Sequence, residues 1–331
     1  MVGNRPHIAE RTVGTLAVTR IGIIALSSYL PGPSVGNSAV AEATGADTDW
    51  MEERIGIRSR HYAQPQETTQ DLATEAAHRL LRETPTRPDL IVLATVTPDQ
   101  PVPATACLVQ NRLALTGVPA VDVNGACSGF VYALAYAYGL TLAGLSRNPL
   151  VIGADIFTRH VDPSDRRTAP LFGDGAGAVL LGPVPNGYGI LGMELWAEGS
   201  QANYATVPPA GNGLFSMNGR GVSEVVLEMG PKVLDTALAR AGVRIEQLER
   251  VIVHQANPSL VHKLAEQVGL DDTVVPALGS RTGNTASASI PLTLALTHQE
   301  KPLRHGDLVA FVAVGAGMTA GAAVIRWYEE G

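Results

Sequence analysis

Two stretches of the chain, DLIVLATVTP at residues 89–98 and ERVIVHQANP at residues 249–258, decide the fold. Each is a short apolar run that is typical of a buried strand and that ends in polar residues. They lie 160 residues apart and begin two series of segments that follow one another in the same order. The other matched pairs are ACLVQNRLAL (106–115) with HKLAEQVGL (262–270), VNGACSG (123–129) with GNTASAS (283–289), and PLVIGADIF (149–157) with DLVAFVAVG (307–315). This order predicts two copies of one α/β unit whose strand ends face a shared cleft.

Short apolar strands alternate with longer helical stretches along the rest of the chain, which favours a layered α/β fold. We predict strands at residues 14–25, 90–95, 120–123, 150–154, 178–181, 251–254 and 308–314. We predict helices at residues 67–81, 104–115, 128–145, 224–241 and 258–268. The Gly- and Pro-rich segment 182–218 is the loosest stretch. We therefore expect one half at residues 1–181 and the other at residues 182–331.

The composition restricts the class of protein. The 331 residues are 45% hydrophobic and carry a formal net charge of −7, which argues against disorder and against a nucleic-acid binder. No apolar run approaches the roughly 20 residues of a membrane span, and residues 1–18 lack the apolar core of a signal peptide. Two cysteines form no disulfide framework. We expect a cytoplasmic enzyme with no metal site and no cofactor.

Cys127 occupies a setting that suits a nucleophile. In VDVNGACSGFVYALAYAYGL (121–140) it lies between a strand and a helix that is apolar almost all round, and such a helix is buried. A helix N-terminus stabilises a thiolate and should lower the pKa of the thiol. Gly125 and Gly129 should allow a tight turn. Cys107, inside an ordinary helical pattern, is expected to be structural.

The duplication brings His254 and Asn284 toward Cys127. His254 ends a predicted strand, and Asn284 is the counterpart of Asn124 in the other copy. Alone, each would be interpreted as a structural residue, but the repeat predicts that all three surround one cleft. The run VGAGMTAG (314–321) leaves no room for a dinucleotide-binding unit, and it suits a backbone N–H aimed at an oxyanion.

These segments resemble the β-ketoacyl-acyl-carrier-protein synthase III family of the thiolase superfamily, from about Ile21 to Tyr328. The matching pieces are SSYLPG, DWMEERIGIRSRH, ACSGF, DPSDRRT, FGDGAGA, HQAN, GNTASASIP and GAGMTAG. The resemblance implies a thiolase fold, in which two duplicated halves form a five-layer αβαβα core, and a homodimer. Two related subfamilies match less well. Thiolases use a second Cys near the C-terminus, which is absent here, and hydroxymethylglutaryl-CoA synthases carry a Glu about where Val96 stands.

The resemblance also implies the chemistry. Cys127 would accept an acyl group from an acyl-CoA, and the N–H groups of Cys127 and Ala316 would form the oxyanion hole. His254 and Asn284 would then donate hydrogen bonds to the enolate that a malonyl thioester leaves when it loses CO2. The enolate would attack the Cys127 thioester to give a 3-ketoacyl product in fatty-acid or polyketide biosynthesis.

The remaining implied positions concern binding. CoA and substrate positions match Trp50, Arg54, Arg166, Phe172, Met217, Gly219 and Asn257. Val102 stands where the family often has a bulky aromatic that closes the primer pocket of the partner subunit, so we expect primers larger than acetyl. The family's basic surface for docking an acidic carrier protein is replaced here by Glu224, Ser259, Glu266 and Gln267. We therefore expect malonyl-CoA, a specialised carrier or a small molecule as the second substrate.

Two alternatives remain open. The acyl group on Cys127 could pass to a hydroxyl or amine, with His254 as general base. Alternatively, Gly125–Gly129 matches the G-x-C-x-G pattern of a nucleophile elbow, and a Cys-dependent α/β hydrolase could use His298 or His305.

Overall fold

A computed structural model describes residues 20–208 and 213–329. Its main sheet has the order β1-β7-β6-β4-β5. The bounds of these strands are β1 (Arg20–Tyr29), β4 (Leu90–Ala94), β5 (Ala120–Val123), β6 (Pro149–Asp155) and β7 (Gly175–Val184). The second sheet has the order β11-β12-β13-β8. Its strands are β8 (Gly189–Ala197), β11 (Arg250–Val253), β12 (Leu308–Gly315) and β13 (Thr319–Arg326).

The two sheets repeat one topology. β4 runs parallel to β6, which is antiparallel to β7, which is antiparallel to β1. In the same relation, β11 runs parallel to β12, which is antiparallel to β13, which is antiparallel to β8. The predicted duplication therefore corresponds to the order and direction of four strands in each sheet. The division of the chain at residues 181 and 182 stays a prediction.

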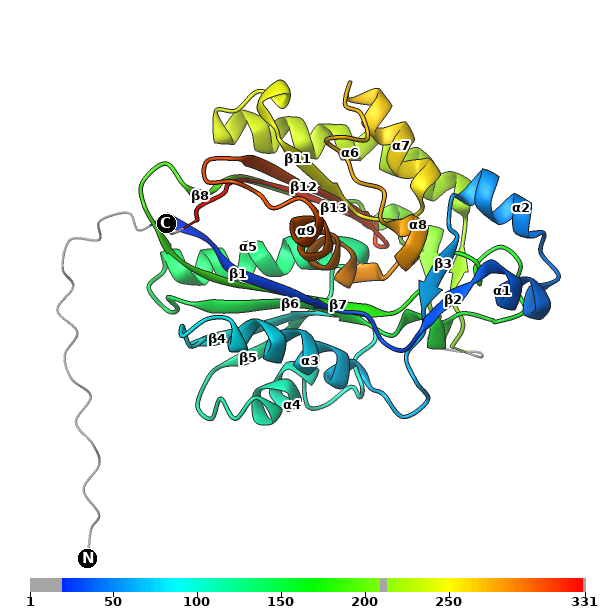
Figure 1. Cartoon of the computed structure of the whole chain (residues 1–331), viewed down its shortest axis with the longest axis horizontal. Coiled ribbons are helices and arrows are strands. Elements are labelled where there is room, and N and C mark those ends of the chain that lie inside the picture. The colour runs from blue at the N-terminus through cyan, green and yellow to red at the C-terminus, as the bar shows by residue number, and fades with distance from the viewer. Residues whose placement is uncertain (1–19, 209–212, 330–331) are drawn as a thin grey trace, which may run out of the picture.

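Helices cover both sheets and fill the space between them. Figure 1 shows α6 and α7 outside the second sheet, α5 and α9 between the sheets, and α3 and α4 outside the main sheet, which gives five layers. The bounds are α3 (Thr69–Arg82), α4 (Thr105–Arg112), α5 (Gly129–Leu142), α6 (Gly219–Ala241), α7 (Pro258–Gln267) and α9 (Ser289–Glu300). Shorter elements are α1 (Asn37–Thr44), α2 (Thr48–Trp50), α8 (Gly279–Thr282) and the strand pairs β2 (Ser34–Gly36) with β3 (Ser59–His61) and β9 (Ala205–Thr206) with β10 (Ser216–Met217).

The distribution of apolar residues along α3 and α5 explains which layer each of these helices occupies. α3 places its apolar side chains on one stripe, buries Leu72, Ala76 and Leu80, and begins at a capping box between Thr68 and Asp71. α5 is apolar almost all round, and it packs in the central core between β4 and β12. The predicted burial is confirmed for the face that contains Phe130, Val131 and Leu134, whereas Tyr136 and Leu142 are exposed.

Two elements differ from the prediction. The segment predicted to be loose contains β8, a strand of 9 residues that closes the second sheet. Helix α9 was absent from the predicted helices because its sequence, SIPLTLALTHQE, carries Pro291 and is buried on most sides, so it has no amphipathic period. The first predicted strand is β1, which begins at Arg20 and continues to Tyr29; residues 14–19 of that prediction lie outside the described residues.

Candidate functional site

A cavity of about 590 Å³ opens where the ends of the two sheets meet. Cys127, His254 and Asn284 all line it. Cys127 comes from the turn Ala126–Ser128 between β5 and α5, and His254 directly follows β11. Asn284 precedes the turn Ala286–Ala288 that leads into α9. The fold thus brings into one cavity three side chains that lie far apart in the sequence.

The turn before α5 holds Cys127 with its backbone in a constrained conformation. Ala126 has φ +49°, in the left-handed region that non-glycine residues rarely adopt, and its N–H donates to Asn124 Oδ1 at 3.2 Å. The left-handed residue of this turn is therefore an alanine, whereas the sequence indicated glycine. At Gly315, an added Cβ would lie 2.7 Å from the Cys127 nitrogen. The end of β12 consequently packs directly under the turn.

The pKa of Cys127 differs from the sequence expectation. Burial raises the pKa of the thiol to about 12, and the negative charge of Asp155 raises it further, while its own backbone N–H opposes the rise. The expectation of a thiol pKa lowered by the helix N-terminus is wrong, because α5 starts two residues later, at Gly129, in the apolar centre of the molecule. At neutral pH Cys127 is a thiol.

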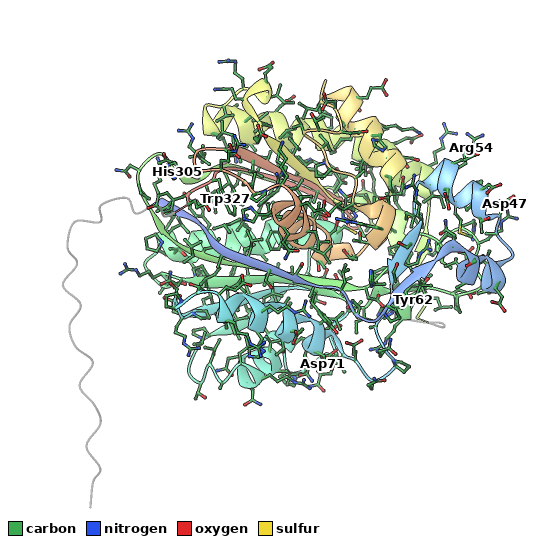
Figure 2. The ribbon with its side chains drawn as sticks, in the orientation of Figure 1. Asp47, Arg54, Tyr62, Asp71, His305 and Trp327 are labelled. Carbon is green, nitrogen blue, oxygen red and sulfur yellow. The ribbon has the colours of Figure 1, made fainter. Side chains whose placement is uncertain are left out.

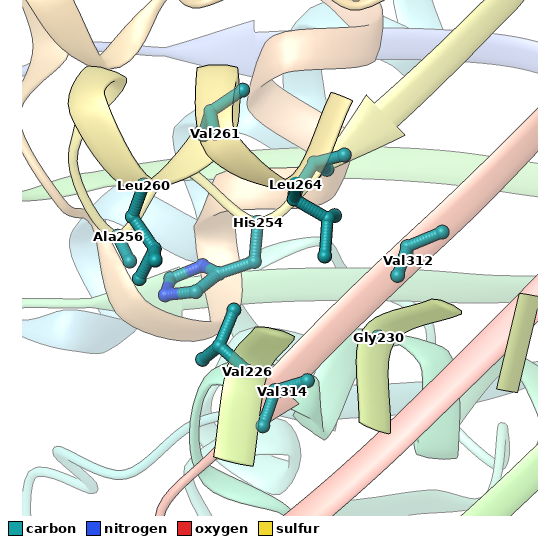
Figure 3. A pocket seen from close by; sticks show the side chains of 10 residues that line it. Val226, Gly230, His254, Ala256, Leu260, Val261, Leu264, Val312 and Val314 are labelled. Atoms are coloured by element: carbon teal, nitrogen blue, oxygen red, sulfur yellow. The ribbon is translucent and has the colours of Figure 1, made fainter. Parts of the chain in front are cut away.

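His254 is held in apolar surroundings. Its side chain is 5% exposed, and its backbone N–H donates to Val312 O at 2.8 Å. Figure 3 shows the ring among side chains of α6, α7 and β12, including Val226, Leu260 and Val314. Burial lowers the pKa of His254 to about 4, so the ring is neutral at pH 7. Within the described part of the chain, Nδ1 is buried without a hydrogen-bond partner.

Asn284 is fixed through its backbone and its side chain. The segment before β7 pairs with it: Asn284 N–H donates to Leu171 O at 2.8 Å, and Gly173 N–H donates to Asn284 O at 3.0 Å. Its Oδ1 accepts the N–H of Ala286 at 2.9 Å. Because the oxygen of the carboxamide is engaged by its own turn, the amide NH2 is the end that remains to donate.

Several other predicted residues line the same cavity, namely Phe172, Met217, Gly219, Asn257 and Ala316. Trp50, Arg54, Arg166 and Val102 do not line it. Arg54 is exposed at the surface (Figure 2), and its carbonyl accepts Ser259 Oγ at 2.8 Å, two residues beyond Asn257. Val102 is 83% exposed in the loop after β4, so it closes no pocket of its own chain.

The sequence analysis missed the aromatic wall of the cavity. Phe157, Phe172 and Phe215 pack together, with ring centroids 4.5, 5.2 and 5.3 Å apart. Only Phe172 was predicted to touch substrate. Phe157 begins a short 3₁₀ helix and Phe215 lies in an irregular segment, and neither has a recognisable spacing in the sequence. Asp155 was also missed, although its sequence signal exists: it is a lone carboxylate at the end of the apolar strand PLVIGAD.

The residues of the hydrolase alternative lie elsewhere. His305 Nε2 contacts the Tyr188 hydroxyl at 2.6 Å, and the ring of His298 lies 5.2 Å from that of Trp327. Figure 2 shows His305 and Trp327 at the opposite end of the molecule from Arg54. Neither histidine lines the cavity that contains Cys127.

No helix within residues 20–208 and 213–329 has the length and apolar character that crossing a membrane requires.

Comparisons with known proteins agree with this geometry. Residues 121–199 match the sequence profile of 3-oxoacyl-[acyl-carrier-protein] synthase III, and residues 238–327 match the profile of its C-terminal region. A curated relative from Caldanaerobacter subterraneus, named beta-ketoacyl-[acyl-carrier-protein] synthase III, is 36% identical over 92% of this chain and 97% of its own.

Solved structures of such synthases have the same fold as this chain. The crystal structure of 3-oxoacyl-[acyl-carrier-protein] synthase III from Aquifex aeolicus is 38% identical, has a TM-score of 0.89, and covers 93% of this chain and 100% of its own. The priming β-ketosynthase of the R1128 polyketide pathway is 26% identical with a TM-score of 0.87, covering 96% and 99%. The predicted thiolase fold is confirmed, and the α/β-hydrolase alternative is wrong.

Proposed function

The chain belongs to the 3-oxoacyl-[acyl-carrier-protein] synthase III family and is an acyltransferase, and from this premise we propose the role of each residue in its cavity. The reaction is the decarboxylative condensation of an acyl primer with a malonyl thioester, in fatty-acid or polyketide biosynthesis. One observation carries the assignment: Cys127, His254 and Asn284 converge on a single cavity of about 590 Å³.

The first step loads the primer. The Cys127 sulfur attacks the thioester carbonyl of an acyl-CoA, and the carbon–sulfur bond to CoA breaks as the new thioester forms. The proton of the Cys127 thiol leaves with the CoA sulfur, so the exchange is balanced. Because burial keeps Cys127 protonated, the free enzyme carries no buried thiolate. The N–H groups of Cys127 and Ala316 stabilise the oxyanion.

The second step forms the carbon–carbon bond. A malonyl thioester loses CO2, and its thioester oxygen becomes an enolate that accepts hydrogen bonds from His254 and from the Asn284 NH2. A proton on the enclosed His254 Nδ1 would be a buried donor without an acceptor, so the neutral ring carries its proton on Nε2 and donates from there. The enolate carbon attacks the Cys127 thioester, and the carbon–sulfur bond to Cys127 breaks as the 3-ketoacyl product is released. The expelled sulfur takes up one proton from solvent, which restores the thiol.

Substrate recognition extends from the cavity to the surface. Met217, Gly219 and Asn257 line the path for the pantetheine arm, and Phe172 faces the acyl group. Trp50, Arg54 and Arg166 lie outside the cavity, where stacking on adenine and pairing with phosphates suit their side chains. The contact of Arg54 with Ser259, near Asn257, supports a CoA path along α7.

Intact mass after incubation with a panel of acyl-CoAs tests the assignment. Wild type should gain the mass of one acyl group, and C127A should gain none. Adding malonyl-CoA should then release CO2 and a 3-ketoacyl product. Acyl transfer to an added hydroxyl or amine without CO2 release would replace condensation by the acceptor alternative. A mass gain retained by C127A would overturn the role of Cys127.

The second substrate is also part of the proposal. Glu224 is exposed on α6 and pairs with Arg220 at 2.9 Å, and Glu266 and Gln267 are exposed on α7. This pairing offsets the charge of Arg220, and Glu266 offsets that of the exposed Lys263, so the surface lacks the excess positive charge that would steer an acidic carrier protein. We expect malonyl-CoA, a specialised carrier or a small acceptor. Weak binding of an acidic carrier protein that strengthens in E224K/E266K supports this, and tight, salt-sensitive binding by wild type contradicts it.

A homodimer completes the proposal. β5 is an edge strand that is half-buried along its length, whereas its neighbour β4 is buried throughout. Such an edge is available to a second copy. In that dimer Val102 of one protomer would face the primer pocket of the other and leave room for primers larger than acetyl. Sedimentation measures the dimer, and a strong preference for acetyl-CoA would contradict the role of Val102.

A cytoplasmic location is the final part of the proposal. It is supported by Cys107 and Cys127, which are both free thiols.

A further inference from the structure

Asp155 is a carboxylate in the core that the proposed chemistry does not use. It is the last residue of β6, is 0% exposed, and is surrounded by hydrogen-bond donors. Its Oδ1 accepts from Thr95 Oγ1, the Val96 N–H, the Thr97 N–H and Thr97 Oγ1, at 2.8–3.2 Å. All four donors belong to the segment that follows β4. One oxygen of Asp155 is thus committed to the main sheet.

The other oxygen of Asp155 reaches the opposite half of the molecule. Oδ2 accepts the N–H of Ser287 at 2.8 Å and also the hydroxyl of Ser287. The same hydroxyl lies 2.8 Å from Ala94 O, at the end of β4. Ser287 is 0% exposed and lies in the middle of the turn Ala286–Ala288. One carboxylate therefore joins the end of the main sheet to the turn that precedes α9.

This turn determines the direction of the Asn284 side chain. Asn284 Oδ1 accepts the Ala286 N–H, and Ala286 has φ +47°, a left-handed conformation that persists only when its surroundings enforce it. The next peptide N–H along the chain is that of Ser287, which Asp155 holds. Losing that contact frees the Ala286–Ser287 peptide, which adjoins the Thr285–Ala286 peptide whose N–H binds the Asn284 carboxamide.

We propose that Asp155 is a positioning residue for Asn284: by fixing the Ser287 N–H it aims the Asn284 NH2 at the enolate. This inference rests on the proposed condensation. It predicts that the two half-reactions respond differently, because Cys127 is held by its own turn and by β12, whereas Asn284 is held by the turn that Asp155 seats. Acyl loading should survive a change at Asp155 that impairs condensation.

The variant D155N tests this with little change in shape. The oxygen of the introduced carboxamide should stay with the four donors of the β4 segment, which leaves its NH2 facing the Ser287 N–H, donor against donor. We expect kcat for condensation to fall at least about tenfold, while the rate of Cys127 acylation is retained or rises, because D155N removes one cause of the raised pKa of Cys127. S287A, which keeps the backbone N–H contact, should lower kcat less than D155N does.

The matched control is T95V, which removes one donor to the same carboxylate without touching Ser287. It should leave both half-reactions near the wild-type rates. Thermal unfolding reports whether each variant is folded at the assay temperature. Equal losses of acylation and condensation in D155N, or an equal loss of condensation in T95V, would overturn the positioning role. Failure of wild type to acylate or to release CO2 would instead overturn the proposed function.

Discussion

Two turns of this molecule, residues 124–128 and 284–288, share one backbone design, and their sequences differ at three of the five positions. In each, an Asn Oδ1 accepts the N–H of an alanine two residues later, at 3.2 and 2.9 Å. Those alanines have φ +49° and +47°, and each turn leads into a helix of the central layer. The residue after the alanine is Cys127 in one turn and Ser287 in the other.

The strand beneath each turn accounts for this difference. Cys127 lies over Gly315 at the end of β12, where an added Cβ would meet the Cys127 nitrogen at 2.7 Å. Ser287 lies over Asp155 at the end of β6, which binds it. Gly315 has no side chain, so the end of β12 approaches the first turn closely, and Cys127 lies beside the cavity. Asp155 instead binds the Ser287 hydroxyl, which is buried. Equivalent geometry therefore suits the proposed catalytic role of Cys127 in one half and the proposed positioning role of Asp155 in the other.

The largest effect should come from making the two turns alike. C127S places a hydroxyl in the first turn, as in the second. Because a serine hydroxyl is a far weaker nucleophile without an activating base, we expect acyl loading to fall by at least about 10³-fold. Intact mass against time measures it. Loading of C127S at a rate near wild type would show that the setting, and not the sulfur, makes the first turn reactive.

The next effect separates the two asparagines. N284A removes a proposed donor to the enolate, so condensation should fall about 10²–10³-fold while acyl loading is retained. N124A, the matched change in the other turn, should affect condensation far less. Both rates come from the same mass and CO2 assays. Similar losses in the two variants would mean that both asparagines serve only to hold their turns.

A pH effect should appear in only one half. The counterpart of His254 in the other half is Ala94, which cannot titrate. The pKa of folded His254 is about 4, below the ordinary value of 6.5, so the unfolded chain binds the proton more readily. This stability cost is absent above pH 6.5 and grows as the pH falls toward 4. At about pH 4.5 it should reach about 2–3 kcal/mol.

Denaturant unfolding at about pH 7 and about pH 4.5 checks this prediction. H254Q, which has no titrating ring, should lose less stability than wild type between the two pH values. An identical loss in both proteins would contradict the buried neutral imidazole.

The smallest of these effects tests the strand beneath Cys127. G315A should crowd the Cys127 nitrogen, displace the turn, and lower the acylation rate roughly tenfold, since small displacements of reacting groups reduce rates strongly. G139A on α5 is the control, because an added Cβ there meets nothing within 4 Å. It should leave acylation unchanged and raise stability slightly. Unchanged acylation in G315A would show that the turn tolerates the added methyl.

The sequence predicted the strands well where apolar runs were bounded by polar residues, as at β4 and β5. It also predicted that Cys127, His254 and Asn284 meet, because the repeat relates their segments. It missed α9, whose burial on most sides removes any helical period, and β8, whose glycines suggested a loop. It indicated the wrong direction for the pKa of Cys127, because local sequence indicates a helix start but not how deeply that start is buried.

The contact of Asp155 with Ser287 could not be predicted from the sequence alone. The carboxylate of Asp155 is visible at the end of an apolar strand, yet its partner Ser287 is 132 residues away. Only the packing of the two halves brings them together. The aromatic wall of Phe157, Phe172 and Phe215 was missed for the same reason.

Each of the two turns is contacted by a residue from the other copy of the repeat, and this has a consequence for engineering. Asp155, from the first copy of the repeat, seats the turn of the second, and Gly315, from the second, seats the turn of the first. Neither copy is a self-sufficient module, so exchanging one copy between relatives has to carry these pairings with it. Chimaeras that keep Asp155 with Ser287 and Gly315 with Cys127 should retain a working site at junctions where other chimaeras lose it.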